Sequence, residues 1–348
     1  MLEATPKIYI EGKEVDFLKG GYKNDGNLTA ASLSFTLPLT FAGLKKLWNK
    51  EVTFFLNEHD SVPIFRGWIR RVKETFSEVE LYAEDALGYM SKGGEETEAK
   101  VNLTNFDNLD GLGAGACIQE LLLKIRLDDK LKTDIIGDTD PVLHTSSPFR
   151  GTMVALDIVK ELLGRAINTD GTLPRPNIGR IVDDGEYSQF VIELESDLDT
   201  TVPKFVFTER YNIKEISITK KRIPTIIIVN GDNTSGKFTH EGALTALDRT
   251  YLEIENKSLK SPAACKEFGA RVFEANAKHQ YEYKISLIGG GYLLENDVIQ
   301  VITDDPEFSG MFRIIGKSVS FSPTDYSVAV MINRKPPTLA QYIASRDN

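Results

Sequence analysis

Four carboxylates at every second position come closest to a chemical site in this sequence: Glu193, Glu195, Asp197 and Asp199. On a β-strand such positions share one side, so these residues would form an acidic strand face. A glycosidase needs two carboxyl groups about 5–10 Å apart across a sugar cleft, one with a raised pKa, and aligned neighbours are a poor source of that asymmetry. A calcium loop would need a D-x-D-x-D-G pattern, which the sequence lacks. The face is interpreted as a solvated surface or as a wall toward a passing polyanion.

The other motifs that resemble cofactor or metal sites fail in their context. Residues 111–116 fit G-x-G-x-x-A, but no buried strand precedes them and Asp110 would repel a phosphate, so they are interpreted as a flexible helix entry. Residues 289–291 are three glycines without the Lys-Ser/Thr of a P-loop, which favours a turn. The histidines lack zinc-ligand spacing; they are His59, His144, His240 and His279. We expect no cofactor and no metal.

Charge and cysteine usage exclude several classes of protein. The net charge is −10 and the pI about 5.1, which argues against gripping nucleic acid or an anionic membrane surface. The basic clusters, Arg70–Arg71 and 220–222, are short, without interleaved aromatics, and are interpreted as solvated turns. Cys117 and Cys265 lie far apart in helix-like segments, so we expect two buried reduced thiols rather than a disulfide.

The length and the apolar pattern predict a globular protein made in the cytoplasm. With 348 residues, the chain has room for two or three domains at about 150 residues each. Its first residues lack the apolar core of a signal peptide. No apolar run approaches the roughly 18 residues that span a bilayer. Export through a cleaved signal and a helical membrane anchor are therefore not expected.

Period-two alternation predicts β-structure at both ends of the chain. A hairpin at 7–15 with its turn near Gly12 opens the first block, and Leu33, Phe35 and Leu37 share one face of the next strand. A polar linker is expected at 93–112. The remaining predicted strands are 52–56, 64–72, 79–83, 189–194, 204–208, 211–218, 224–230 and several within 281–333.

Helical spacing predicts three helices between these strands. The first contains Ile118, Leu121, Leu122 and Ile125, and the second repeats an apolar residue every four positions from Val154 to Ala166. Thr152 is the predicted N-cap of the second helix and Ser261 that of the third, which starts at Pro262 and ends near Lys278. A short helix is expected at 339–345. Strands and helices do not alternate regularly, so the predicted class is α+β, mainly β, rather than a doubly wound sheet.

One stretch of the chain echoes another. Residues 51–85 contain a strand, an acidic turn, a glycine-containing strand and a final strand, and residues 297–330 repeat that order. The identity between the two stretches is slight. We interpret them as a structural repeat, which predicts two similar β-barrels with helical material between them.

A set of short β-patterns resembles a known family. The sequence has a glycine-rich turn, an L-x-x-x-D-x-I step, a G-x-F-x-I strand and a hydrophobic–Ser strand. These are at 289–291, 293–299, 310–314 and 319–322, with further similarity at 65–69, 81–87, 213–217, 226–231, 261–262 and 283–285. The combination resembles phage late control protein D and the baseplate-hub proteins of contractile tails. The acidic 93–200 stretch is a departure from that pattern.

The resemblance implies a structural, non-enzymatic virion protein with two tail-tube-like barrels. Three chains would form a homotrimeric ring that joins a hexameric tail tube to a trimeric central spike and leaves a channel for DNA. The implied partners are the tube or tube-initiator protein, a separate spike chain and baseplate wedge proteins, with no membrane contact. The implied place is the tail baseplate, assembled in the host cytoplasm. The four carboxylates at 193–199 are then candidates for the channel wall, because a negative wall repels DNA.

The implied domain boundaries follow the β-blocks. The first barrel is expected at 1–92, an inserted α+β domain at 93–204, the second barrel at 205–335 with a helical insertion around 235–280, and a tail at 336–348. Three alternatives remain open at this point. They are a carbohydrate-active hydrolase that uses the strand carboxylates, the hub of a phage-related injection particle, and a β-rich binding module without an assembly role.

Overall fold

In the computed structural model the described residues form mainly β-strands, together with four helices. The described residues are 5–26, 28–38, 46–57, 60–92, 100–102, 114–127, 131–135, 152–165, 177–194, 202–220, 223–240, 249–256, 259–278, 281–295, 297–304 and 308–334. The mainly β class predicted from sequence is confirmed. The chain forms two compact units, Met1–Val206 with Ser286–Val298 and Ile314–Val330, and Phe207–Ile285 with Ile299–Arg313 and Met331–Asn348.

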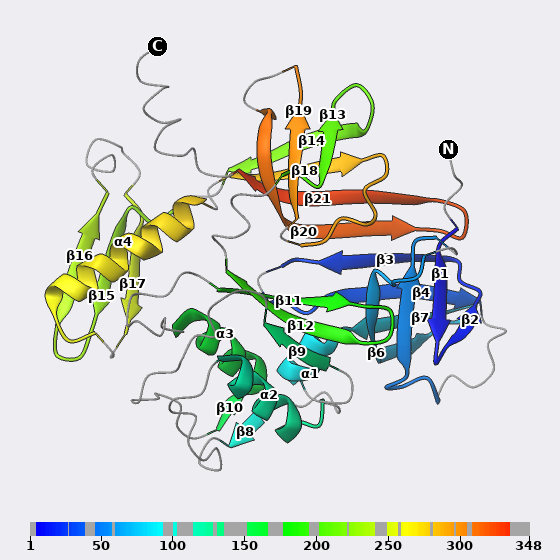
Figure 1. Ribbon diagram of the computed structural model, residues 1–348, viewed down its shortest axis with the longest axis horizontal. Helices are drawn as coiled ribbons and strands as arrows, with labels where there is room; N and C mark the ends of the chain where they lie inside the picture. The colour runs from blue at the N-terminus through cyan, green and yellow to red at the C-terminus, as the bar shows by residue number, and fades with distance from the viewer. Residues whose placement is uncertain are drawn as a thin grey trace. The chain divides into compact units, whose positions relative to one another are not determined.

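The first unit is built on one antiparallel sheet (Figure 1). Its N-terminal strands are β1 (Lys7–Ile10), β2 (Lys13–Val15), β3 (Lys19–Asn24), β4 (Ser32–Pro38), β5 (Glu51–Phe55), β6 (Phe65–Glu74) and β7 (Glu78–Glu84). Strand β20 (Gly310–Phe321) joins them through β3, in the order β20-β3-β4-β7-β6-β5-β1-β2. The sheet therefore places a late strand of the chain beside an early one.

The predicted alternation is confirmed in this sheet. Leu33, Phe35 and Leu37 of β4 are buried, and the β1–β2 turn is formed by Glu11 and Gly12, both with positive φ. Such a two-residue turn matches the right-handed twist of the strands. Phe321 of β20 stacks on Phe54 of β5 with ring centroids 4.1 Å apart. The apolar core thus reaches strands from both ends of the chain.

The segment after β7 packs its own elements around a second core. These are α1 (Ala86–Lys92), β8 (Lys100–Asn102), α2 (Ala114–Lys124), β9 (Leu131–Ile135), β10 (Thr152–Val154), α3 (Ala155–Arg165), β11 (Asn177–Asp183) and β12 (Ser188–Leu194). The core contains Ile118, Ile158 and Phe190 together with Trp68 of β6. The Trp68 ring meets Tyr89 of α1 edge-to-face at 5.0 Å. The helical segment is therefore packed against the first sheet rather than separate from it.

The predicted cap of the second helix is wrong. Thr152 lies in β10, where its backbone pairs with Asn102 of β8, and α3 begins only at Ala155. A residue held in a strand ladder cannot also cap a helix three positions further on. Of the predicted apolar repeat, Ile158 is buried in α3, whereas Val154 lies in β10 before the helix begins. Ala166 and the predicted 339–345 helix lie outside the described residues.

The second unit contains a small sheet under a helix. Its elements are β13 (Phe205–Thr208), β14 (Ile213–Lys220), β15 (Ile226–Asn230), β16 (Ser235–Thr239), β17 (Tyr251–Glu255), α4 (Pro262–Lys278), β18 (Tyr281–Leu287) and β19 (Val298–Ile302). Helix α4 packs on β15 and β16 and shares a core with Ile227 and Val229 (Figure 1). Ser261 caps α4 as predicted, since its Oγ accepts the Ala264 N–H at 3.2 Å. No helix among the residues described is long and apolar enough to cross a bilayer.

The predicted repeat is present in the strand order. Strands β5, β6 and β7 follow one another as a meander, each paired with the next. Strands β19, β20 and β21 (Tyr326–Arg334) pair in the same succession. Two segments far apart in sequence thus have one topology.

Candidate functional site

The acidic strand face is only partly within the described structure. Glu193 lies in β12, in register with Ile178 of β11, whereas Glu195, Asp197 and Asp199 lie outside the described residues. Strand β12 is the middle strand of its sheet, with β11 on one side and β9 on the other. Its residues 190–192 are all buried. Consecutive residues of a strand point to opposite faces, so both faces of β12 are buried just before the acidic run begins.

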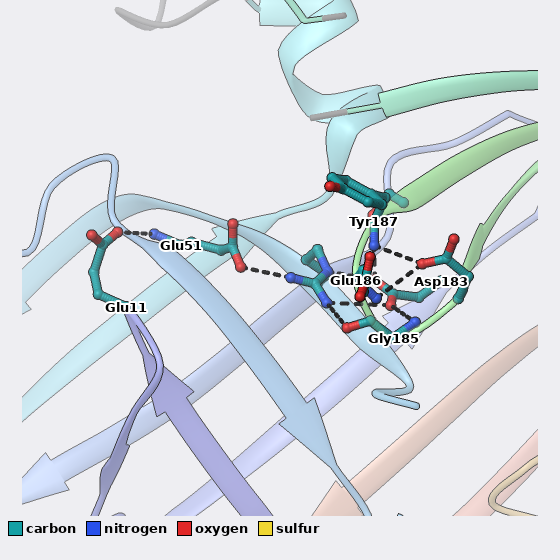
Figure 2. Close-up of polar contacts among 9 residues, drawn as sticks. Glu11, Glu51, Asp183, Gly185, Glu186 and Tyr187 are labelled. Atoms are coloured by element: carbon teal, nitrogen blue, oxygen red, sulfur yellow. Dashed lines mark hydrogen bonds and ion pairs between the residues drawn. The ribbon is translucent and has the colours of Figure 1, made fainter. Parts of the chain in front are cut away.

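A polar site inside the first unit is centred on Arg66 of β6, and we call it the Arg66 joint. The guanidinium donates through Nε to Asp183 Oδ2 at 2.6 Å and through Nη2 to the Gly185 carbonyl at 2.8 Å. Its Nη1 reaches Glu51 Oε1 of β5 at 2.7 Å. Figure 2 shows Glu51, Asp183 and Gly185 converging from separate elements. One side chain thus ties the first sheet to the β11–β12 turn.

The Arg66 joint pairs charged groups that are largely buried. Asp183 is 7% exposed and Arg66 12%. Burial opposes the charge of Arg66, but hydrogen bonds and charges from Asp183 and Glu51 outweigh it and raise the pKa of Arg66 above its ordinary value. Planar, bidentate Arg–carboxylate pairing is among the strongest polar contacts in proteins.

The neighbouring turn and hairpin are held by the same kind of contact. Asp183 Oδ1 accepts the Gly185 N–H at 2.8 Å, and Asp184 Oδ1 accepts the Tyr187 N–H at 2.7 Å. The Tyr187 contact is the main cause that lowers the pKa of Asp184. On the other side, Glu11 Oε1 accepts the Glu51 N–H at 2.9 Å (Figure 2). The Arg66 joint is therefore one part of a polar chain from the β1–β2 turn to the β11–β12 turn.

A polar cavity of about 90 Å³ lies beside the Arg66 joint, inside the first unit. Its lining includes Tyr22, Asp85, Glu295 and Lys317 as well as Asp183. The cavity is large enough to hold water. Tyr22, Asp85 and Lys317, which line it, are all buried.

Asp85 caps helix α1 from a buried position. Its Oδ1 accepts the N–H groups of Leu87 at 3.0 Å and Gly88 at 3.3 Å. Burial raises the pKa of Asp85 to about 7 in spite of these hydrogen bonds. At neutral pH the carboxyl group therefore exchanges between its charged and neutral forms.

Lys317 is another buried titratable group. Its Nζ donates to the carbonyls of Leu293 at 2.9 Å and of Gly291, and it lies 5.7 Å from the centre of the Tyr22 ring. Burial lowers the pKa of Lys317 to about 7, which the charge of Asp297 offsets in part. This amine fastens the glycine-rich turn to β20. Both of these hydrogen bonds are to backbone carbonyls, as expected of a structural contact.

The interpretation of Arg70 as part of a solvated turn is wrong. Arg70 lies inside β6 and is 5% exposed. Its guanidinium lies 4.2 Å from the Tyr89 ring centre and 3.9 Å from a Glu84 oxygen. A shift of register between Ile69 and Arg71 turns the Arg70 side chain inward, a bulge that composition cannot indicate. Lys220 ends β14, and residues 221–222 lie outside the described structure.

The remaining sequence candidates take structural places. Gly289 and Gly290 have φ of +86° and +77°, so the predicted turn is confirmed, and a Cβ on Gly291 would lie 2.1 Å from Leu56. Cys117 and Cys265 are buried free thiols, as predicted. His240 packs on Phe273, while His59, His144 and His279 lie outside the described residues. Residues 111–113 of the 111–116 motif also lie outside them, and residues 114–116 belong to α2.

The residues that form these buried polar sites were not predicted from the sequence. Asp184-Gly185 between apolar alternating runs is a strong hairpin signal, and it would have located the β11–β12 turn and Asp183. Asp85, directly after a strand and before a helix, has the position of an N-cap. Arg66 and Lys317 gave no signal, because nothing local marks a cation as buried.

Solved structures of tail proteins share this fold. A tail protein from Neisseria meningitidis MC58 matches 96% of this chain and 97% of its own length, with a TM-score of 0.68 and 13% identity. The 43 kDa tail protein of prophage MuSo2 from Shewanella oneidensis matches 95% and 97%, with a TM-score of 0.64 and 10% identity. The tail-protein β-fold that the sequence resemblance implies is confirmed at nearly full length.

A secretion-system protein has the same fold. The c3393 protein of E. coli, described as a component of the type VI secretion system with structural similarity to the T4 tail proteins gp27 and gp5, matches 95% of this chain and 79% of its own. Its TM-score is 0.58 at 11% identity. No protein-family model and no curated protein matches this chain in sequence. The likeness is therefore one of fold.

Proposed function

We propose that this protein is the structural hub of a phage-tail baseplate. The observation that carries the proposal is the fold match over 96% of this chain and 97% of the Neisseria tail protein. Because the match covers nearly the full length of both chains, the similarity extends over the whole fold and is not limited to one widespread module. The described polar sites support a structural role, because Arg66 and Lys317 tie distant segments together.

In this proposal the protein acts as a homotrimeric ring. Each chain supplies two similar barrels, at 1–92 and 205–335, with an inserted domain at 93–204 and a tail at 336–348. The repeated meander β5–β7 and β19–β21 supports that reading. Three copies with two barrels each present six similar units to a hexameric tube, and their threefold axis matches a trimeric spike. The tube or tube-initiator protein, the spike and the wedge proteins are the proposed partners.

The proposed channel conducts DNA without binding it. The chain carries a net charge of −10, and a negative wall repels phosphates and prevents stalling. We assign Glu193, Glu195, Asp197 and Asp199 to that wall as part of the proposal. The place of action is the virion tail, with assembly in the host cytoplasm.

An injection particle is a second candidate for the same hub role. The observation that favours it is the fold match to the E. coli type VI component at a TM-score of 0.58. A hub of either kind would form the same ring. The two differ in whether DNA or protein cargo passes, so packaged particles that carry this chain would be assayed for DNA.

The experiment that tests the hub is the mass of the purified protein in solution by light scattering. Three copies of 38.8 kDa give about 116 kDa. That mass, followed by a ring with a central channel in electron micrographs, is the expected result. A stable dimer would contradict the hub, because a twofold assembly cannot match a sixfold tube with two barrels per chain.

A second measurement separates the hub from a carbohydrate-active hydrolase. Glu193→Gln and Glu195→Gln remove the carboxylates that a glycosidase would use while keeping their size. We expect neither variant to change the assembly or any sugar-cleaving activity of the preparation. Loss of a sugar-cleaving activity with the ring intact would overturn the non-enzymatic assignment.

A further inference from the structure

Phe76 is held out at the tip of the β6–β7 hairpin. Its side chain is fully exposed, at 104% of the reference value. The turn beneath it is fixed, because the Thr75 N–H donates to the Glu78 carbonyl at 2.9 Å and the Glu78 N–H donates to Thr75 Oγ1 at 3.2 Å. An aromatic side chain on a rigid turn loses little freedom on binding, and such residues dominate interface energetics.

Two glutamates flank the hairpin tip. Glu74 and Glu78 flank Phe76 at the ends of the two strands. Lys73 is already engaged by Glu80, with Nζ 3.0 Å from Oε2. The tip therefore presents an apolar anchor between carboxylates.

A groove of about 570 Å³ crosses the same sheet over β3, β4, β7 and β20. Its lining includes Gly20, Gly21, Ser34 and Tyr82. At Gly21 the nearest atoms to an added Cβ are 3.8 and 4.0 Å away, which is ordinary van der Waals contact without a clash. A benzyl side chain fits into this volume together with the turn that carries it.

The rim of the groove complements the hairpin tip in charge. Lys19 and Arg71 line it on the cationic side. Two carboxylates also line it, but Glu80 is paired with Lys73, and Asp325 Oδ1 accepts the Tyr326 N–H at 2.8 Å. Arg71 also lies over the Tyr82 ring, 5.1 Å from its centre. The two cations line the groove where an acidic partner would bind.

We propose that the β6–β7 tip of one copy of this chain docks in the groove of a second copy, with Phe76 over Gly21 and with Glu74 and Glu78 against Lys19 and Arg71. The two surfaces differ, so the contact is heterologous and passes from copy to copy around a ring. This inference rests on the proposed function, because it supplies one subunit contact of the ring.

Cysteine cross-linking between two single variants tests the contact directly. Phe76→Cys is co-expressed with a tagged chain that carries Ser34→Cys, and the purified mixture is oxidised. Each chain has one new thiol, so a disulfide between a tagged and an untagged chain joins two copies. The native Cys117 and Cys265 are 1% and 0% exposed and do not compete.

The expected result is a mixed disulfide dimer at several times the level of a control pair. The control replaces Phe76→Cys with Tyr211→Cys, a tyrosine that is 80% exposed elsewhere on the chain. Equal yields from the two pairs would overturn the proposed contact. A wild-type ring together with equal yields would leave the hub standing and remove only this contact.

Association of the chain tests the anchor and the charges. Phe76→Ala is expected to weaken association about 30-fold, the equivalent of a 2 kcal/mol hot spot. Glu74→Lys should dissociate the ring, and adding Lys19→Glu in the same chain should restore it, whereas Glu215→Lys on β14 should have no effect. An unchanged mass for Phe76→Ala and Glu74→Lys at all concentrations would refute the inference. A wild-type chain that stays monomeric would overturn the contact and the hub together.

Discussion

Arg66 Nε lies 2.6 Å from Asp183 Oδ2, although 117 residues separate the two along the chain. The pair joins β6 of the first sheet to the β11–β12 turn, and both side chains are largely buried. Breaking such a pair leaves an uncompensated buried charge, which costs more than the intact pair contributes. The change in unfolding free energy caused by one substitution in the Arg66 joint should therefore show how much the joint contributes to holding the β11–β12 turn on the first sheet.

Asp183→Ala is expected to lower the free energy of unfolding of the first unit by about 3 kcal/mol. The reason is that Arg66 stays buried without its carboxylate, and that the Gly185 N–H loses its acceptor. Urea unfolding followed by tryptophan fluorescence measures this, because Trp48 and Trp68 both belong to the first unit. Glu80→Ala, which breaks the exposed pair with Lys73, is the matched control and should cost less than about 1 kcal/mol. Equal losses for the two variants would show that the Arg66 joint contributes no more than a surface pair.

Gly26→Ala is expected to destabilise the protein much more than Gly12→Ala. Both glycines have positive φ, +68° and +72°, where an alanine costs roughly 1–2 kcal/mol. At Gly12 nothing lies within 4 Å of an added Cβ, whereas at Gly26 the Ile315 carbonyl oxygen would be 2.0 Å away. The backbone of β20 would have to move, so the difference between the variants should exceed about 2 kcal/mol in thermal or urea unfolding. Similar costs would mean that β3 and β20 are not held this closely.

Asp85 should make the protein less stable as the pH rises from about 4 to about 7. Its pKa is near 7 in the folded chain and near 3.9 in an unfolded one, so the folded state holds the proton more tightly across that window. Asp85→Asn keeps an acceptor for the α1 N–H groups and removes the titration. From pH 4.5 to pH 7, the free energy of unfolding should fall less in this variant than in the wild type. Parallel curves for the two proteins would argue against a buried, titrating Asp85.

Lys317 should act in the opposite direction at higher pH. Its pKa is near 7 in the folded chain against about 10.4 when unfolded, so the folded state prefers the neutral amine and stability rises from pH 7 to about 10. Lys317→Met should abolish that rise in unfolding free energy. Lys204→Met is the control, because Lys204 is 46% exposed and pairs with Asp297 at 2.9 Å. If the rise in unfolding free energy persisted in Lys317→Met and disappeared in Lys204→Met, its source would be Lys204 and not Lys317.

Strands, turns and helix starts that depend only on neighbouring residues could be predicted from the sequence. Alternation placed β4 and its buried Leu33, Phe35 and Leu37, and Ser261 with Pro262 marked the start of α4. Glycines that need positive φ marked the turns at Gly12 and Gly289. These signals succeed because strand pleat, helix capping and backbone sterics act over a few residues. The mainly β class and the repeated meander followed from the same signals.

The contacts between residues that are far apart in sequence could be seen only in the folded structure. Nothing near Arg66, Arg70 or Lys317 in sequence shows that their charges are buried, because burial depends on strands that arrive from more than 100 residues away or on a bulge of one residue. The same holds for Thr152, which fits a helix cap locally but pairs with β8 instead. A long-range hydrogen-bond ladder outweighs a single cap, which contributes only about 1 kcal/mol. Local chemistry thus set the elements, and the competition among long-range contacts set the polar sites between them.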